Sequence, residues 1–489
     1  MSPKFRSAVP WLAALAAAAH AASFVGHGPC DDDFITYRYA RNLIEGAGLV
    51  FNLGERVEGF SAPGWMLLVA AALRCGLDPE RFSVVVSILA SGLAAWCVGE
   101  LWRRRHPQSW SAGPAWLVAA TPAIGWHAII GLGTVVLAAL LALWALLWER
   151  AIAREKPAFA AALVLGLAAF VRNEAVLFAL PFLVFERRRG FLPTALTSLV
   201  PLAAWQIFRL AYFGRWTPVT YSVKKLAFAD DLRLGLEYLA QSNSECGIGV
   251  LIVLAAVAAS AEGRLGQVRA VALGFLAHVA YVVYVGGDFL PFARFFVPAL
   301  PLGAWLAFEG ARSLIGSRTV LGVLGFAAGA GLLQLQQTRR AEFYADHSDS
   351  EPRWKLMGET VVRAVPPHTK VALAPIGAFG WVSRLPLVDM LGLTNTAILE
   401  APPDLGVKLK GHQRYDAEWV LAQRPEMIII GNGWLHANEL RASHWERTLV
   451  EHPRFQSDWT PMRIEIPGSY PLLFFWRSDA PPPTGSTPL

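Results

Sequence analysis

Long apolar stretches alternate with short polar stretches from the N-terminus to about residue 335. A helix needs roughly 17–25 mainly apolar residues to cross a bilayer, and the alternation predicts about eleven such helices. The predicted spans are 8–25, 81–102, 113–129, 132–147, 158–171, 175–185, 191–213, 247–260, 271–285, 295–310 and 321–335. The pattern therefore predicts a polytopic α-helical membrane protein.

Two of the apolar stretches have a second interpretation. Residues 8–25 are also compatible with a cleaved signal peptide, but we expect a retained helix, because it would anchor the acidic run that follows. Residues 61–73 are apolar but short. We expect them to lie along the membrane surface, because a span here would move Arg103-Arg104-Arg105 away from the side of the other basic clusters.

Composition and charge agree with a membrane protein. Of the 489 residues, 54% are hydrophobic and 16% are charged, whereas soluble domains carry about 25% charged residues. The formal net charge is +6, but the basic residues form short clusters at the ends of apolar stretches. This is the positive-inside pattern and not the pattern of a nucleic-acid-binding protein, and it places the remaining polar segments outside the cytoplasm.

The chain becomes more polar from residue 336, and strand-like runs alternate with helical stretches. We expect strands at 370–375, 426–430, 462–466 and 471–476, and helices at 354–364 and 417–423. The sequence therefore predicts a transmembrane domain over 1–335, with its first external loop at 28–80, and a C-terminal extracytoplasmic α/β domain over 336–479. The Pro-rich residues 480–489 are predicted to be a disordered tail.

The first external segment begins with Asp31-Asp32-Asp33, directly after the first span. Placing carboxylates at the end of a membrane helix costs free energy, so such residues are candidates for a functional role. Residues 31–45 have the pattern of an amphipathic helix, with Arg38 on its polar face, and we expect this helix to lie on the membrane. Acids also stabilise helix N-termini, so capping is the structural alternative, above all for Asp33.

Other external segments carry groups that suit a phosphate. A carboxylate can deprotonate a hydroxyl, and Arg or Lys can hold a phosphate leaving group. The candidates are Arg172, Lys224, Lys225 and Arg294, and their alternative is snorkelling toward lipid head groups. Glu174 and Asp288 could simply pair with neighbouring arginines. The sequence has no P-loop, dinucleotide-binding, zinc-protease or nucleophile-elbow motif, which argues against a nucleotide-driven pump or a serine hydrolase.

Several external motifs resemble those of a known family. They are DDDFITYRYARN at 31–42, GLVFN at 48–52, ERVEG at 55–59, YFG at 212–214 with Pro218, Thr220, Tyr221 and Lys224, GGD at 286–288 with Arg294, VDMLGL at 388–393, and Gly411-His412 with Asp416. With these motifs the chain resembles the GT-C superfamily of polyprenyl-phosphate-sugar-dependent glycosyltransferases. The resemblance is to the bacterial group that includes the mycobacterial terminal β-(1→2)-arabinofuranosyltransferase.

The resemblance implies an inverting transfer of arabinofuranose, or of a hexose such as mannose, at the outer face of the bacterial inner membrane. The donor is a polyprenyl-phosphate sugar, and the acceptor is a cell-envelope glycan, a glycolipid or a protein. One of Asp31 and Asp32 is expected to be the base. We expect Asp31 in that role, with Asp32 orienting the acceptor or linked to a metal, and Lys224, Arg294 and Arg172 binding the donor phosphate.

The other residues expected at the acceptor site or in the pocket are Asp33, Arg38, Glu58, Glu174, Tyr221, Asp288 and His412. No metal ligands are assigned, and a divalent cation is left open. The chain departs from the family at Gly133, where a glutamate is usual, and at Asn173, where proline is usual. A non-catalytic scaffold is therefore one alternative. A transporter of lipid-linked sugars is another, although it would place charges inside the spans.

Overall fold

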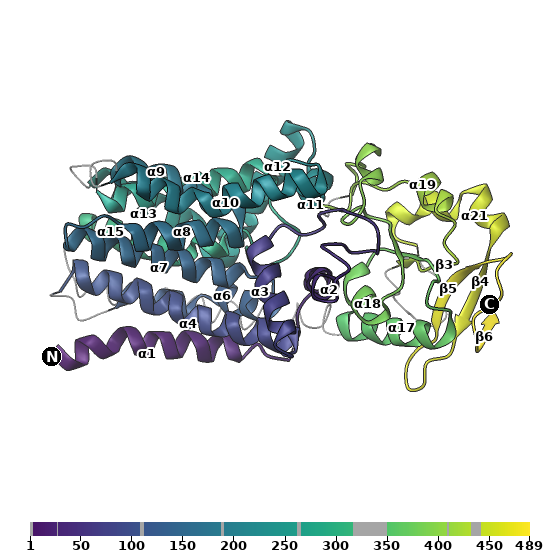
Figure 1. Cartoon of the computed structure of the whole chain (residues 1–489). Helices are drawn as coiled ribbons and strands as arrows, with labels where there is room; N and C mark the ends of the chain where they lie inside the picture. Colours follow the sequence, from purple (N-terminus) through teal and green to yellow (C-terminus); the bar gives the residue numbers. More distant parts are fainter. Residues whose placement is uncertain are drawn as a thin grey trace.

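The computed structural model describes residues 3–26, 28–107, 112–186, 190–261, 266–315, 350–407, 410–431 and 442–489. Figure 1 shows a bundle of long helices beside a mixed α/β part, with the N-terminus at the far end of the bundle and the C-terminus in the α/β part. The predicted span 321–335 lies outside the described residues.

The bundle contains most of the helices. They are α1 (Pro3–Ala22), α4 (Pro79–Arg105), α5 (Gly113–Ala120), α6 (Pro122–Ile130), α7 (Thr134–Ala153), α8 (Phe159–Val171), α9 (Ala179–Glu186), α10 (Phe191–Phe213), α12 (Phe228–Cys246), α13 (Ile248–Ala261), α14 (Gln267–Tyr284) and α15 (Leu300–Ile315). Among the described residues, α4, α7, α10 and α14 are long and apolar enough to cross a membrane, and the bent pair α12–α13 would add a fifth span. The chain is therefore a polytopic membrane protein, while a total of about eleven spans stays a prediction.

Some predicted segments differ in shape from the expectation. The span predicted at 113–129 is divided into α5 and α6, because Pro122 has no N–H group to continue a helix. The span predicted at 175–185 begins with the 3₁₀ helix η1 (Asn173–Phe178) before α9. The loop predicted after α10 is mostly helical, because it contains α11 (Val219–Lys224) and α12.

Among the described residues, basic side chains of α1 and α4 lie at the end of the bundle that is far from the α/β part (Figure 1). Arg105, at the end of α4, pairs with Glu149 of α7 at 3.1 Å and with Glu309 of α15 at 3.4 Å. Arg6 of α1 donates to the carbonyl of Pro107 at 3.1 Å. One end of the bundle is therefore basic, as the positive-inside pattern predicts.

Between the two parts of the molecule lie α2 (Asp31–Ile44) and α3 (Pro63–Arg74) (Figure 1). The polar face of α2 is covered by protein and not exposed to water, and its place on the membrane stays a prediction. Arg38 is only 4% exposed, because it donates to the backbone carbonyls of Phe51, Gly380 and Leu385 at 2.9, 3.0 and 2.8 Å. The α/β part therefore satisfies the polar face of this helix in place of water.

The α/β part is built on a six-stranded sheet with the order β2-β1-β3-β5-β4-β6. Its strands are β1 (Val371–Leu373), β2 (Leu387–Asp389), β3 (Met427–Ile428), β4 (Trp459–Ile464), β5 (Leu472–Arg477) and β6 (Ser486–Pro488). Its helices include α17 (Ser350–Ala364), α18 (Ile376–Ser383), α19 (Ala417–Ala422), α20 (Arg447–Val450) and α21 (Pro453–Asp458). The four predicted strands correspond to β1, β3, β4 and β5, and the neighbours of β1 are parallel to it.

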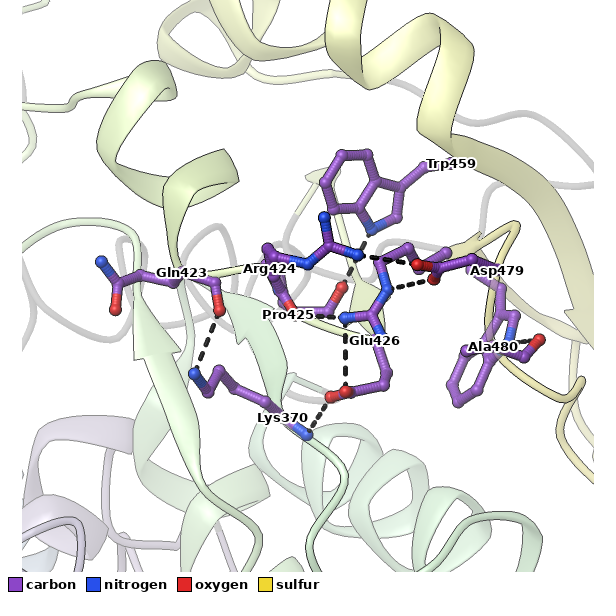
Figure 2. A network of polar contacts seen from close by, with 10 residues as sticks. Lys370, Gln423, Arg424, Pro425, Glu426, Trp459, Asp479 and Ala480 are labelled. Carbon is purple, nitrogen blue, oxygen red and sulfur yellow. Dashed lines mark hydrogen bonds and ion pairs between the residues drawn. The ribbon is translucent and has the colours of Figure 1, made fainter.

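The tail at 480–489 was predicted to be disordered, and this prediction is wrong. Its strand β6 pairs with β4 in antiparallel fashion. Just before the tail, Asp479 accepts a hydrogen bond from Arg424 at 2.7 Å (Figure 2) and pairs with Arg477. Arg477 also pairs with Glu426 at 3.3 Å. The composition indicated disorder because it does not show that β4 offers an open edge to the tail.

Candidate functional site

A cavity of about 410 Å³ lies where the first loop, the bundle and the α/β part meet. Its charged lining residues are Asp32, Arg172, Glu174, Arg209, Lys224, Lys225, Arg294 and Lys410. Buried Glu58, Asp231 and Asp288 pair with four of the six bases, so six bases face five acids in all. The small net positive charge favours an anionic ligand. Six of the predicted site residues line this cavity, namely Asp32, Arg172, Glu174, Tyr221, Lys224 and Arg294.

Asp32 and Arg294 form the polar centre of the cavity. Arg294 is buried, and its Nη1 lies 3.9 Å from Oδ2 of Asp32. Asp288 is also buried and accepts a hydrogen bond from Nη2 of Arg294 at 2.6 Å. Asp288 therefore orients the guanidinium group, while Asp32, whose side chain is 26% exposed, remains accessible to a ligand.

Asp31 does not line the cavity. Its Oδ1 accepts a hydrogen bond from the backbone N–H of Ala378 at 2.7 Å, and its Oδ2 accepts one from Gly377 at 3.0 Å. Both N–H groups belong to the first turn of α18, where a carboxylate is favoured by the helix dipole. Asp31 therefore ties the first loop to the α/β part, and of the two aspartates only Asp32 lines the cavity.

Asp33 and Glu58 do not line the cavity, and their side chains form bonds that stabilise the fold. Oδ2 of Asp33 accepts the backbone N–H of Cys30 at 3.1 Å, which caps α2. Burial and the adjacent Asp32 raise the pKa of Asp33 well above its ordinary value, which favours its neutral form. Glu58 forms a buried bidentate pair with Arg209 at 2.6 and 3.2 Å, which fixes the first loop to α10.

Lys224 also lines the cavity, and its Nζ lies 5.7 Å from the centroid of the Phe289 ring. Among the lining cations of the described chain, Lys224 alone has no carboxylate partner. Arg172, for comparison, pairs with Glu174 at 2.5 Å. His412 also packs edge-on against Phe289, and burial together with the ammonium group of Lys224 lowers the pKa of His412 and favours its neutral form.

The sequence did not reveal Lys410 or Asp231 as site residues. Lys410 lies in the α/β part, is 5% exposed and pairs with the fully buried Asp231 of α12. Asp231 also pairs with Lys225 at 2.8 Å. Lys410 and Asp231 are 179 positions apart, so no local pattern could have indicated this pair.

Metal ligands are not grouped in the part of the chain that the structure describes. There, no three His, Cys, Asp or Glu side chains come together in a way that could hold a metal ion. The carboxylate of Asp32 instead forms an ion pair with the guanidinium group of Arg294.

Comparisons with known proteins support the resemblance. Residues 339–475 match a family model described as a domain of unknown function, DUF8728. The terminal β-(1→2)-arabinofuranosyltransferase of Mycobacterium tuberculosis is 32% identical over 248 residues, which are 46% of this chain and 39% of that protein. The protein of the same name from Corynebacterium glutamicum is 28% identical over 344 residues, which are 59% of this chain and 49% of that protein.

The chain thus spans less than half the length of these two relatives. Among solved structures, ArnT from Cupriavidus metallidurans bound to undecaprenyl phosphate aligns with a TM-score of 0.48 and 12% identity, over 77% of this chain and 84% of that chain. The two relatives confirm the predicted resemblance to the terminal β-(1→2)-arabinofuranosyltransferase group.

Proposed function

We propose that this protein is a membrane glycosyltransferase that moves a sugar from a polyprenyl-phosphate donor to a hydroxyl group of a glycan, glycolipid or protein. One observation carries the proposal: an accessible carboxylate, Asp32, shares a positively lined cavity with Lys224 at one end of a membrane bundle. The names of the two relatives support a sugar transfer with arabinofuranose as the sugar. A hexose such as mannose is the alternative sugar of this proposal.

In this proposal Asp32, and not Asp31, is the general base, because only Asp32 lines the cavity. Asp32 accepts the proton of the acceptor hydroxyl, whose oxygen forms a bond to the anomeric carbon. The bond between that carbon and the phosphate oxygen breaks, and the configuration at the carbon inverts. Lys224 and Arg172 stabilise the charge of the leaving phosphate, and the guanidinium group of Arg294 lies 3.9 Å from Asp32.

We also propose that the cavity and the α/β part face the extracytoplasmic side of a bacterial inner membrane. The support is the basic end of the bundle, which includes Arg103, Arg104 and Arg105 and lies away from the α/β part. Exposed apolar side chains along the bundle, such as Leu89 and Ile207, suit contact with membrane lipids.

The test is sugar transfer by the purified protein in lipid, with a panel of labelled polyprenyl-phosphate sugars, with and without a chelator. Wild type is compared with Asp32→Asn and with Glu237→Gln, a control carboxylate that is 61% exposed on α12. Transfer from one donor that is lost only in Asp32→Asn supports the proposal. No transfer from any donor supports a scaffold, and sugar that crosses the bilayer without covalent attachment supports a transporter.

A further inference from the structure

Three consecutive residues of the α/β part, Lys410, Gly411 and His412, lie beside the part of the cavity wall that carries Lys224 and Lys225. Lys410 lines the cavity itself. Gly411 lies against the aliphatic stem of Lys224, since a Cβ at Gly411 would be 3.0 Å from Cε of that lysine. His412 packs on Phe289 with ring centroids 5.2 Å apart. The membrane helices therefore do not form this wall by themselves.

Asp231 connects this segment to the bundle. Its Oδ1 pairs with Lys410, while its Oδ2 pairs with Lys225 at 2.8 Å and accepts the backbone N–H of Leu226 at 3.2 Å. Asp231 has no exposed surface and does not line the cavity, whereas both lysines do. Because one carboxylate neutralises only one of two ammonium groups, the pair of lysines keeps a net positive charge beside the cavity.

The backbone near Asp231 leaves room for Lys410. Gly286 has a φ of +80°, and a Cβ at this position would lie 2.6 Å from Nζ of Lys410. The left-handed conformation favours glycine here, and a Cβ would displace the end of the Lys410 side chain. The ammonium group of Lys410 therefore lies between the buried carboxylate of Asp231 and the backbone of Gly286.

We infer that Asp231 is a positioning residue, which holds Lys410 of the α/β part and Lys225 of the bundle as paired ligands for the donor phosphate. This inference rests on the proposed function and adds Lys410 as a phosphate ligand from the α/β part, beside Lys225 of the bundle. A phosphodiester donor has one negative charge, and the phosphate that leaves gains a second. Two ammonium groups fixed before the reaction match the charge that develops during transfer.

The test measures binding of a polyprenyl phosphate to the full chain in lipid nanodiscs, with the uncharged prenol of the same length as the reference. Lys410→Met removes one ammonium group, and Asp231→Asn removes the charge that holds both lysines. Each variant is expected to raise the Kd for the polyprenyl phosphate about tenfold and to leave prenol binding unchanged. The double variant should be less than about tenfold weaker than either single variant, because both act on one contact.

Lys355→Met is the matched control. Lys355 pairs with Glu80 at 2.6 Å, which also joins the α/β part to the bundle, but neither residue lines the cavity. If Lys355→Met weakens phosphate binding as much as Asp231→Asn does, then Asp231 only docks the two parts and the inference is refuted. Wild-type binding in Lys410→Met also refutes it, and this variant alone decides the test if Asp231→Asn does not fold.

The inference and the proposed function can fail separately. If polyprenyl phosphate binds in a way that depends on Lys410 but no sugar is transferred, the phosphate site stands and the proposed function does not. If sugar transfer requires Asp32 but phosphate binding is the same in wild type and Lys410→Met, the function stands and the role of Asp231 is refuted.

Discussion

Asp31→Asn and Asp32→Asn are expected to damage the protein in different ways, although the residues are adjacent. The Asp31 carboxylate accepts two backbone N–H groups of α18, at 2.7 and 3.0 Å. A hydrogen bond to a charged group contributes about 1.5–3 kcal/mol, and asparagine keeps one acceptor oxygen. Because Asp31 is partly exposed, the lower end of this energy range applies. Asp31→Asn should therefore lower the free energy of unfolding by about 1.5 kcal/mol.

Asp32→Asn should leave stability nearly unchanged. Its ion pair with Arg294 is long, at 3.9 Å, and the Asp32 side chain is 26% exposed. A pair this long, with one partner partly exposed, contributes at most about 1 kcal/mol. If Asp32 is the general base, however, its loss lowers kcat by about 10²- to 10⁴-fold.

The assay combines kcat for sugar transfer at saturating donor with the unfolding free energy of each variant. Asp32→Asn should lose transfer and keep its stability, and Asp31→Asn should lose stability and keep most of its transfer. Glu237→Gln is the control for both measurements. The assignment is refuted if Asp31→Asn loses transfer as completely as Asp32→Asn while its stability equals that of wild type.

Three further predictions test other parts of the structure. Gly377→Ala should destabilise the protein by about 1–3 kcal/mol in thermal unfolding, because a Cβ there would collide with the carbonyl oxygen of Asp31; wild-type stability would contradict the close packing of α18 on α2. Burial raises the pKa of Glu446 from 4.5 to about 7, so its contribution to stability is complete below pH 4.5 and is lost as the pH rises through about 7. Glu446→Gln should flatten that part of the curve of unfolding free energy against pH, and an unchanged slope would show that another group titrates. Lys224→Met should raise the donor KM about tenfold in steady-state kinetics, whereas an unchanged KM would exclude Lys224 from the phosphate site.

The polar face of α2 shows what the hydrophobic pattern could not predict. The pattern correctly indicated an amphipathic helix, with Arg38 on its polar side. It does not distinguish water from the carbonyl groups of another part of the protein, because both satisfy a guanidinium group. The carbonyls that bind Arg38 belong to Gly380 and Leu385, which lie 342 and 347 positions further along the chain.

The site was predicted best where charged residues lie in the polar segments between the apolar stretches of the sequence. Arg172, Lys224 and Arg294 are of this kind, and all three line the cavity with Asp32. The different roles of Asp31, Asp32 and Asp33 could not be predicted, because three identical side chains give no local signal of which one caps, which one anchors and which one faces the cavity. Asp231 was missed for another reason, since α12 was expected to be a loop.

The buried cluster beneath α2 is shared by both parts of the molecule. It contains Phe34 and Trp65 from the first loop together with Val371 and Phe379 from the α/β part. The sequence family, however, covers only residues 339–475, and a fragment cut at these bounds would expose the apolar side chains that α2 and α3 now cover. We therefore expect that an α/β part from a related protein could be exchanged into this chain only together with its own first loop. The first loop and the α/β part would then form one exchangeable unit, although they are far apart in the sequence.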